Sequence, residues 1–242
     1  MKIKALTCDA LARPAYWCAA QSPHVVDIEL LRFGLHNTPQ KLRGLLQARL
    51  AAAGKSYDAV VLAYGLCGSA TAGLKAIHIP LVIPRAHDCI TLFLGSRRRY
   101  QEAFEKKPGT YWYVQDYIER GQDADAALSI GSGMGSDLTG VYEAYVQQYG
   151  EDNAAYLMEV MGAWQQHYQR AAWIEMGIGD ETAAASRAQA EAERRGWAFE
   201  RLAGDMNLIR QLLWGEWNEN FLIVRPGEGI AMCYDEDIVC NR

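Results

Sequence analysis

The sequence predicts an α/β fold built on a Rossmann-like parallel sheet. Short apolar runs alternate with helical segments through the first 100 residues, which is typical of βαβ units with helices on both faces of a sheet. The run Val60-Val61-Leu62 carries no polar side chain and lies between turn residues, as expected for a strand that is buried on both faces. The same alternation resumes from Trp173 onward.

In the N-terminal part, the expected helix over residues 39–53 has the clearest boundaries. Thr38 is a favourable N-cap, Pro39 suits the first helical turn, and Gly54 follows the last apolar residue. A helix is also expected over 90–104. The other expected elements are strands over 2–8, 25–31, 57–64 and 81–83, and helices over 13–22 and 70–76.

Beyond residue 110 the sequence predicts a helical segment and then a second α/β region. Residues 138–172 favour one or two long helices. The order strand–helix–strand over 197–224 is similar to that over 25–64, which indicates two pseudo-repeated lobes with a cleft between them. A single mixed sheet with a helical insertion is the alternative. The expected domains are an N-terminal lobe over 1–110, a connecting segment over 111–172 and a C-terminal lobe over 173–242.

Composition and charge exclude two classes of partner. The formal charge of −5 opposes a nucleic-acid surface, which needs a clustered basic face, and Arg97-Arg98-Arg99 is expected on a solvated helix face. No apolar run approaches the ~20 residues that span a bilayer, and the first residues lack the apolar core of a signal peptide. We therefore expect a cytoplasmic protein with no nucleic-acid or membrane partner.

Three of the six cysteines carry little functional signal. In a reducing compartment a chain of 242 residues does not need a disulfide framework, so free thiols are expected. Cys18 lies in a predicted helix beside Trp17 and is expected in the core. Cys233 and Cys240 flank an acidic stretch that is expected to be exposed to solvent.

The other three cysteines follow the ends of predicted strands. In an open parallel sheet, ligands bind outside the carboxyl ends of the strands. Cys8 ends the first strand, Cys67 follows the strand over 57–64, and His87 and Cys89 follow the strand over 81–83. Thiolates and a neutral imidazole are ligands for zinc, which takes four of them in a structural site and keeps one position open in a catalytic site. The alternative is a [4Fe-4S] cluster held by the three cysteines alone.

Several polar residues surround this predicted site. Arg85 precedes the His-X-Cys stretch and suits a substrate carboxylate or phosphate. Asp88, like Asp9, can orient an imidazole or act as an acid or base, and Tyr64 can donate a hydrogen bond. Gly65 and Gly68 allow the backbone to turn tightly around Cys67 and to approach a cofactor.

The stretches Tyr64-Gly65-Leu66-Cys67-Gly68 and Pro84-Arg85-Ala86-His87-Asp88-Cys89 resemble the domain-of-unknown-function 1638 family. Further similarity lies at Leu35-His36-Asn37 and between Asp205 and Trp217, so the resemblance covers nearly the whole chain. Members are similar to proteins found near corrinoid-dependent methyl-transfer systems of anaerobes. The resemblance therefore implies one-carbon chemistry, with a corrinoid protein or a methyltransferase as the partner.

Together these observations predict a metal-dependent transferase of methyltransferase type. Zinc would present a substrate thiol as a thiolate, and Arg85 would hold the anionic tail of a small-molecule substrate that is anionic or a thiol. A looser analogy supports this reading, because zinc methyltransferases that alkylate thiols use a His-X-Cys pair and a distant cysteine. The alternatives are an iron–sulfur protein that acts on sulfur compounds and a non-catalytic accessory protein that binds a metal or a corrinoid.

Overall fold

The computed structural model describes residues 1–107, 109–120, 151, 168–233 and 236–242. Its main sheet has five strands in the order β2-β1-β3-β4-β8. The first four are mutually parallel, and β8 runs antiparallel to β4. The strands are β1 (Lys2–Cys8), β2 (Val25–Leu31), β3 (Ala59–Ala63), β4 (Leu81–Pro84) and β8 (Phe221–Val224). The predicted α/β class and the four N-terminal strands are therefore confirmed.

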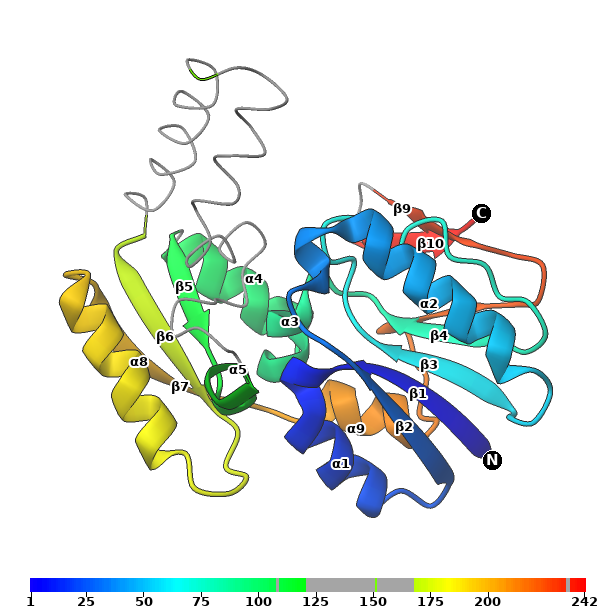
Figure 1. The fold of residues 1–242 in the computed structure, drawn as a ribbon, viewed down its shortest axis with the longest axis horizontal. Coiled ribbons are helices and arrows are strands. Elements are labelled where there is room, and N and C mark those ends of the chain that lie inside the picture. The colour runs from blue at the N-terminus through cyan, green and yellow to red at the C-terminus, as the bar shows by residue number, and fades with distance from the viewer. Residues whose placement is uncertain (108, 121–150, 152–167, 234–235) are drawn as a thin grey trace.

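Helices cover both faces of this sheet in a Rossmann-like arrangement. In Figure 1, α2 lies over one face, and α1 and α9 lie side by side under the other. Their bounds are α1 (Ala12–Ala20), α2 (Pro39–Ala53) and α9 (Asn207–Leu213), with the 3-10 turns η1 (Asp9–Leu11) and η2 (Leu35–Asn37) after β1 and β2. All five residues of β3 are buried, as predicted for a strand between two helical layers.

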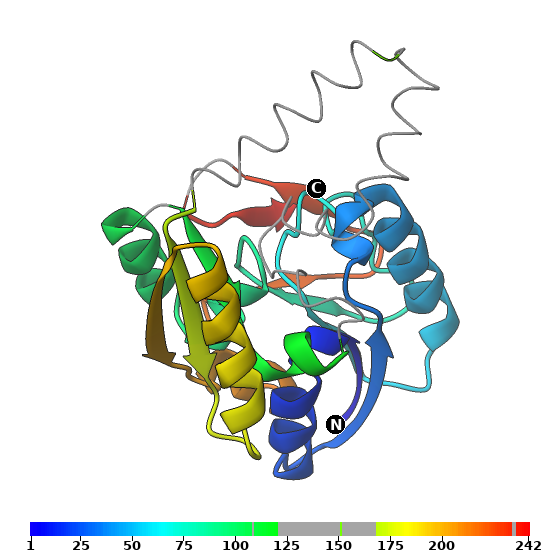
Figure 2. The ribbon, with the colours of Figure 1, turned by 60° about the vertical axis from the view of Figure 1, so that its left-hand side comes forward.

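A second, smaller sheet is parallel throughout. Its order is β5-β6-β7, and α8 packs against it on the side that faces forward in Figure 2. The core between them contains Trp173 and the small residues of α8, of which Ala188 and Ala192 are fully buried. The elements are β5 (Thr110–Tyr113), β6 (Arg170–Glu175), β7 (Ala198–Ala203) and α8 (Thr182–Arg194).

The two sheets are not pseudo-repeats of one strand–helix–strand unit. The predicted likeness between 25–64 and 197–224 fails because β7 belongs to the second sheet whereas β8 joins the first. At its C-terminal end the chain returns to the main sheet through β8. The helices expected from residue 138 fall largely outside the described residues, and β6 begins at Arg170, before their expected end.

Two predicted helices differ from the structure for local reasons. Residues 70–76 form turns instead of a helix, because Gly73 and Ala76 donate their N–H groups to Ile230 and Glu228, far along the chain. The helix expected over 90–104 is divided into α3 (Cys89–Leu94) and α4 (Arg97–Lys106). It breaks at Gly95, which has a φ of 67° and ends α3 in the left-handed conformation.

The remaining elements connect the two sheets and close the C-terminal end. In Figure 1, α3, α4 and α5 (Gln115–Arg120) lie between the two sheets. The hairpin β9 (Ile230–Met232) and β10 (Val239–Asn241) carries a disulfide between Cys233 and Cys240, where two free thiols were expected. Across the described ranges, no helix has the length and apolar character needed to cross a membrane.

The central strand should dominate the stability of the main sheet. Leu62 is fully buried between the helical layers, so Leu62→Ala is expected to lower the free energy of unfolding by roughly 2–5 kcal/mol. Ile223, on the edge strand β8, is 42% exposed, and Ile223→Ala should change it by less than about 1 kcal/mol. Urea unfolding of both variants checks the difference, and equal losses would contradict this assignment of the core.

Candidate functional site

Two loops that follow β3 and β4 pack directly against each other at the carboxyl edge of the main sheet. The N–H of Leu66 donates to the carbonyl of Ala86 at 2.8 Å, and the N–H of Cys67 donates to that of His87 at 2.9 Å. A Cβ atom on Gly65 would lie 2.6 Å from the Cα atom of Asp88, closer than real contacts allow. Glycine is therefore required at position 65 because protein backbone approaches it closely, whereas the cofactor contact predicted for Gly65 stays a prediction.

Cys67 lies in a strained backbone conformation. Its φ is 47°, and Gly68 and Ser69 follow with φ values of 62° and 69°. A side chain in this left-handed region costs roughly 1–2 kcal/mol, a cost that glycine does not incur. The chain therefore carries a thiol at a position where glycine would be less strained, which is typical of functional sites.

The three predicted cysteine ligands line one small cavity at this edge, which we call the thiol cavity. Cys8, Cys67 and Cys89 are free and buried, with 7–9% of their surface exposed. The cavity has a volume of about 20 Å³. Its other lining residues are Arg32, Phe33, Leu35, His36, Leu42, Tyr64 and Asp88. The three thiols that the sequence predicted at one edge of the sheet thus line the same cavity.

Burial keeps these thiols protonated. It raises the pKa of Cys67 to about 12, and the nearby Asp88 carboxylate adds to this effect. Burial is also the largest cause of the raised pKa values of Cys8 and Cys89. For Cys89 the charges of Asp88, Cys67 and Cys8 raise it further, which shows how closely these groups are placed. Three neighbouring buried thiols of this kind would need a bound cation to become thiolates.

Two further polar atoms of the thiol cavity have no hydrogen-bond partner among the described residues. They are the hydroxyl oxygen of Tyr64 and the Nε2 atom of His36. Burial lowers the pKa of His36 and so favours its neutral form, while the pKa of Tyr64 is raised, first by burial and then by the neighbouring thiols. Buried polar groups are seldom left unpaired, so both atoms are available to a bound group. Tyr64 was a predicted site residue, whereas His36 was not.

His87 lies on the opposite side of the two loops, in the lining of a much larger cavity of about 1460 Å³, which we call the large cavity. Its ring centroid is 6.5 Å from that of Tyr100. The chain turns between His87 and Cys89 because α3 begins at Cys89, so the predicted His-X-Cys pair is divided between two cavities. Over the residues that the structure describes, no group of three or more His, Cys, Asp or Glu has the arrangement of a preformed metal site.

Asp88 belongs to the wall between the two cavities and lines both. One carboxylate oxygen accepts from the N–H groups of Ile90 and Thr91, which caps α3, and the other accepts from the Tyr100 hydroxyl at 3.1 Å. Burial raises the pKa of Asp88, although these hydrogen bonds oppose the effect. The predicted acid–base residue thus also has a structural role, because it fixes the helix that begins with Cys89.

Arg85 lines neither the thiol cavity nor the large cavity. Its guanidinium group donates to the backbone carbonyls of Val239 and Asp237 and pairs with the Asp237 carboxylate at 3.4 Å. It therefore attaches the C-terminal hairpin to the end of β4. The substrate contact predicted for Arg85 does not fit this position.

Sequence reasoning missed the loop that follows β2. Arg32 is exposed and Phe33 is half-buried, and both line the thiol cavity. The loop is held by Asp9, whose carboxylate accepts from the Phe33 N–H at 2.6 Å. The position of β2 next to β1 could have indicated this, because its carboxyl end must reach the same edge of the sheet as Cys8.

Comparison with known families identifies a family for most of the chain. Residues 30–213 match a family described as a protein of unknown function, DUF1638. The chain belongs to the DUF1638 family. No curated protein and no solved structure matches it.

The DUF1638 match includes most of the thiol cavity but not all of it. Cys67, His36 and Cys89 lie within residues 30–213, whereas Cys8 precedes the match and the Cys233–Cys240 hairpin follows it. The resemblance stated from the sequence is confirmed at the level of the family, whose description assigns no reaction.

The contact between the two loops can be tested through Gly65. Gly65→Ala should force the loops apart, because its Cβ atom would clash with the backbone of Asp88, and the alkylation of Cys67 and Cys89 should accelerate by at least about tenfold. Gly44→Ala is the control, since Gly44 lies in α2 with nothing within 4 Å of the added Cβ atom. Residue-specific alkylation read by mass spectrometry would show no difference between the two variants if the loops were not in contact.

The buried thiols also predict a pH dependence for the protein freed of metals by a chelator. Above pH 9 the unfolded chain loses its thiol protons, whereas folded Cys67 keeps its proton until about pH 12. The folded state then binds more protons, so its stability should fall as the pH rises through this window. Urea unfolding should show a shallower fall for Cys67→Ala than for the unmodified protein, and parallel curves would contradict the shifted pKa.

Proposed function

We propose that this DUF1638 protein is a metal-dependent enzyme whose centre is one thiophilic ion, with zinc as the first candidate, held by Cys8, Cys67 and Cys89. The observation that carries the proposal is the convergence of three free, buried thiols from three strand ends on one cavity. Nothing in ordinary core packing requires a cysteine with a φ of 47° at position 67.

The cavity fits a single ion better than an iron–sulfur cluster. Its volume of about 20 Å³ is close to the space that one water molecule needs, whereas a cluster of four irons and four sulfides is several times larger. The donors are those of a thiophilic ion: three sulfur atoms, with the neutral, unpartnered imidazole of His36 beside them. His36 therefore replaces His87 as the imidazole nearest to the proposed ion.

The proposed reaction is transfer of a methyl group from the corrinoid of a partner protein to a substrate thiol, which forms a thioether, leaves the corrinoid demethylated and releases the thiol proton. A bound zinc ion would lower the pKa of that thiol and favour its nucleophilic thiolate form. The Nε2 atom of His36 is free to accept the proton that the thiol loses, and the Tyr64 hydroxyl is free to donate a hydrogen bond to sulfur. Methyl transfer itself draws its support from the resemblance to proteins near corrinoid-dependent systems.

The large cavity is the proposed place for the substrate. It is separated from the thiol cavity by a wall that includes Asp88, so the substrate thiol reaches the proposed ion only when this wall opens. Arg97 also lines it, and its guanidinium group donates to the backbone carbonyl of Glu236 at 2.7 Å without a carboxylate partner among the described residues. Arg97 is thus better placed than Arg85 to bind the anionic tail of a substrate.

The size of the large cavity favours a second candidate function. Its volume of about 1460 Å³ exceeds the roughly 300–1,000 Å³ that is usual for small ligands, which suits a bulky cofactor. An accessory protein that carries a metal and a corrinoid for a partner methyltransferase would use such a space. Isothermal titration with a cobalamin distinguishes it from the enzyme, because only the accessory protein should bind the corrinoid tightly.

Cys67→Gly tests the metal centre with little effect on the fold. Glycine relieves the strained φ, so the free energy of unfolding of the metal-free variant should stay within about 1 kcal/mol of the unmodified protein. After incubation with zinc and desalting, the unmodified protein should retain about one zinc ion per chain, and Cys67→Gly should bind zinc at least about tenfold more weakly.

Cys18→Ala is the matched control, because Cys18 is also a free buried cysteine but does not line the thiol cavity. This variant should retain zinc like the unmodified protein. Elemental analysis with a competing chelator provides the measurement. The proposal would be overturned if the unmodified protein retained no zinc, or if Cys67→Gly retained it with unchanged affinity.

A further inference from the structure

A short helix of the second sheet reaches across to the thiol cavity. α5 follows β5 directly and packs against η1, the turn immediately after Cys8. Its first four residues are buried: Gln115, Asp116, Tyr117 and Ile118. The edge of the main sheet that carries the thiols is therefore covered by a helix that belongs to the other sheet.

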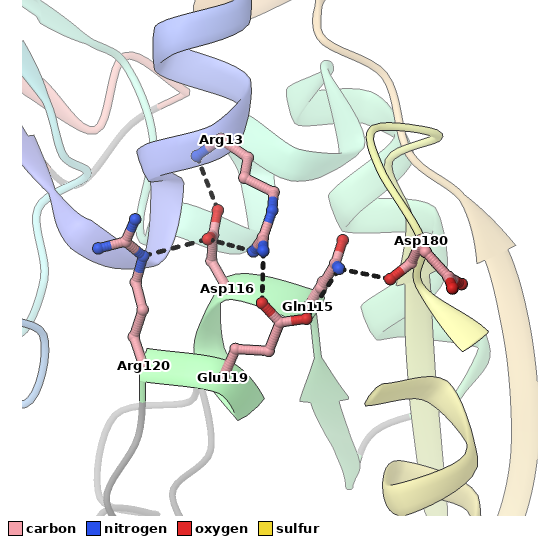
Figure 3. Close-up of polar contacts among 6 residues, drawn as sticks. All are labelled: Arg13, Gln115, Asp116, Glu119, Arg120 and Asp180. Carbon is pink, nitrogen blue, oxygen red and sulfur yellow. Dashed lines mark hydrogen bonds and ion pairs between the residues drawn. The ribbon is translucent and has the colours of Figure 1, made fainter. Parts of the chain in front are cut away.

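Asp116 is the centre of the contact that holds α5 in this place. Its carboxylate is 3% exposed and accepts the backbone N–H of Arg13 at 2.7 Å and the Nη1 atom of the same residue at 2.6 Å. It also accepts from Nε of Arg120 at 3.1 Å. Figure 3 shows both guanidinium groups converging on this carboxylate, one from α1 and one from α5. Three charge-assisted or backbone hydrogen bonds to one buried group make a strong and geometrically defined contact.

Neighbouring residues extend this contact in both directions. The second nitrogen of the Arg13 guanidinium, Nη2, pairs with Glu119 one turn along α5. Gln115 donates to the carbonyl of Asp180 at 2.7 Å, in the loop between β6 and α8, as Figure 3 also shows. The network therefore connects the start of α1, which follows the Cys8 strand, to the body of the second sheet.

The residue next to Asp116 packs against a lining residue of the thiol cavity. The Tyr117 ring packs against Phe33, with 4.8 Å between the ring centroids, and Phe33 lines the cavity. Burial raises the pKa of the Tyr117 hydroxyl, and the charges of Cys89 and Cys8 are among the further causes, so this side chain lies near the thiols. Displacement of α5 would remove Tyr117 from Phe33 and loosen this wall.

We propose that Asp116 is a positioning residue: by holding α5 against Arg13 it keeps Tyr117 and Phe33 over the thiol cavity, and so it sets how fast the cavity exchanges its contents with solvent. A buried ion pair adds little net stability compared with apolar packing, but loss of one partner opens the contact. The part of the proposal that concerns solvent access to the thiols rests only on the contacts of α5 described above. Only the exchange of a bound ion rests on the proposed function.

Asp116→Asn tests the proposal, because it keeps the size of the side chain and removes its charge. In the metal-free protein, iodoacetamide labelling of Cys8, Cys67 and Cys89, resolved by mass spectrometry, should accelerate by about tenfold or more. Release of zinc from the loaded protein to a chelator should accelerate in parallel. Arg13→Lys and Arg13→Met both keep the backbone donor, but only Arg13→Lys keeps the positive charge, so its cavity thiols should be labelled more slowly than those of Arg13→Met.

Two controls separate this role from a general loss of stability. Labelling of Cys18, a free buried thiol outside the cavity, should not change in Asp116→Asn. Glu175→Gln removes an ion pair with Arg201 on the exposed surface of the second sheet and should leave all rates unchanged. The proposal is overturned if the three cavity thiols keep their original rates, or if Cys18 accelerates equally. Faster labelling in a protein that binds no zinc would refute the proposed function and leave this inference standing.

Discussion

The packing of two backbone loops at the edge of the main sheet is the contact on which the site depends. Gly65 allows the loop after β3 to meet the loop after β4, and two backbone hydrogen bonds hold them together. This contact places Cys67 and Cys89 on one side, with His87 on the other and Asp88 between. Asp88 lines both cavities and therefore belongs to the wall between them.

The sequence was sufficient to predict the elements that depend on residues close together along the chain. The strands predicted over 2–8, 57–64 and 81–83, together with the rule that ligands gather at strand ends, predicted that Cys8, Cys67 and Cys89 lie close together, and they line one cavity. It was not sufficient for His87, because the separation of this residue from Cys89 depends on the first turn of α3. The sequence signal of a His-X-Cys pair contains no information about that turn.

Contacts between distant segments account for the other differences. Residues 70–76 lose their helix to hydrogen bonds with residues 228–230, and β8 adds an antiparallel strand to a sheet that it reaches only after the second sheet is complete. The salt bridge between Arg13 and Asp116 joins residues 103 positions apart. No periodicity or spacing along the chain predicts such contacts. The position of α5 next to the thiol cavity could therefore be recognised only from the folded structure.

The hairpin disulfide and the proposed centre require opposite redox states from five of the six cysteines. Cys8, Cys67 and Cys89 act in the proposed centre only as free thiols, whereas Cys233 and Cys240 are joined in the segment that Arg85 holds against the end of β4. A dithiol reductant that keeps the three cavity thiols reduced also reduces the hairpin disulfide. An oxidant that preserves the disulfide also oxidises the cavity thiols. A reducing environment therefore favours the free thiols of the proposed centre and opposes the hairpin disulfide, and an oxidising environment does the reverse.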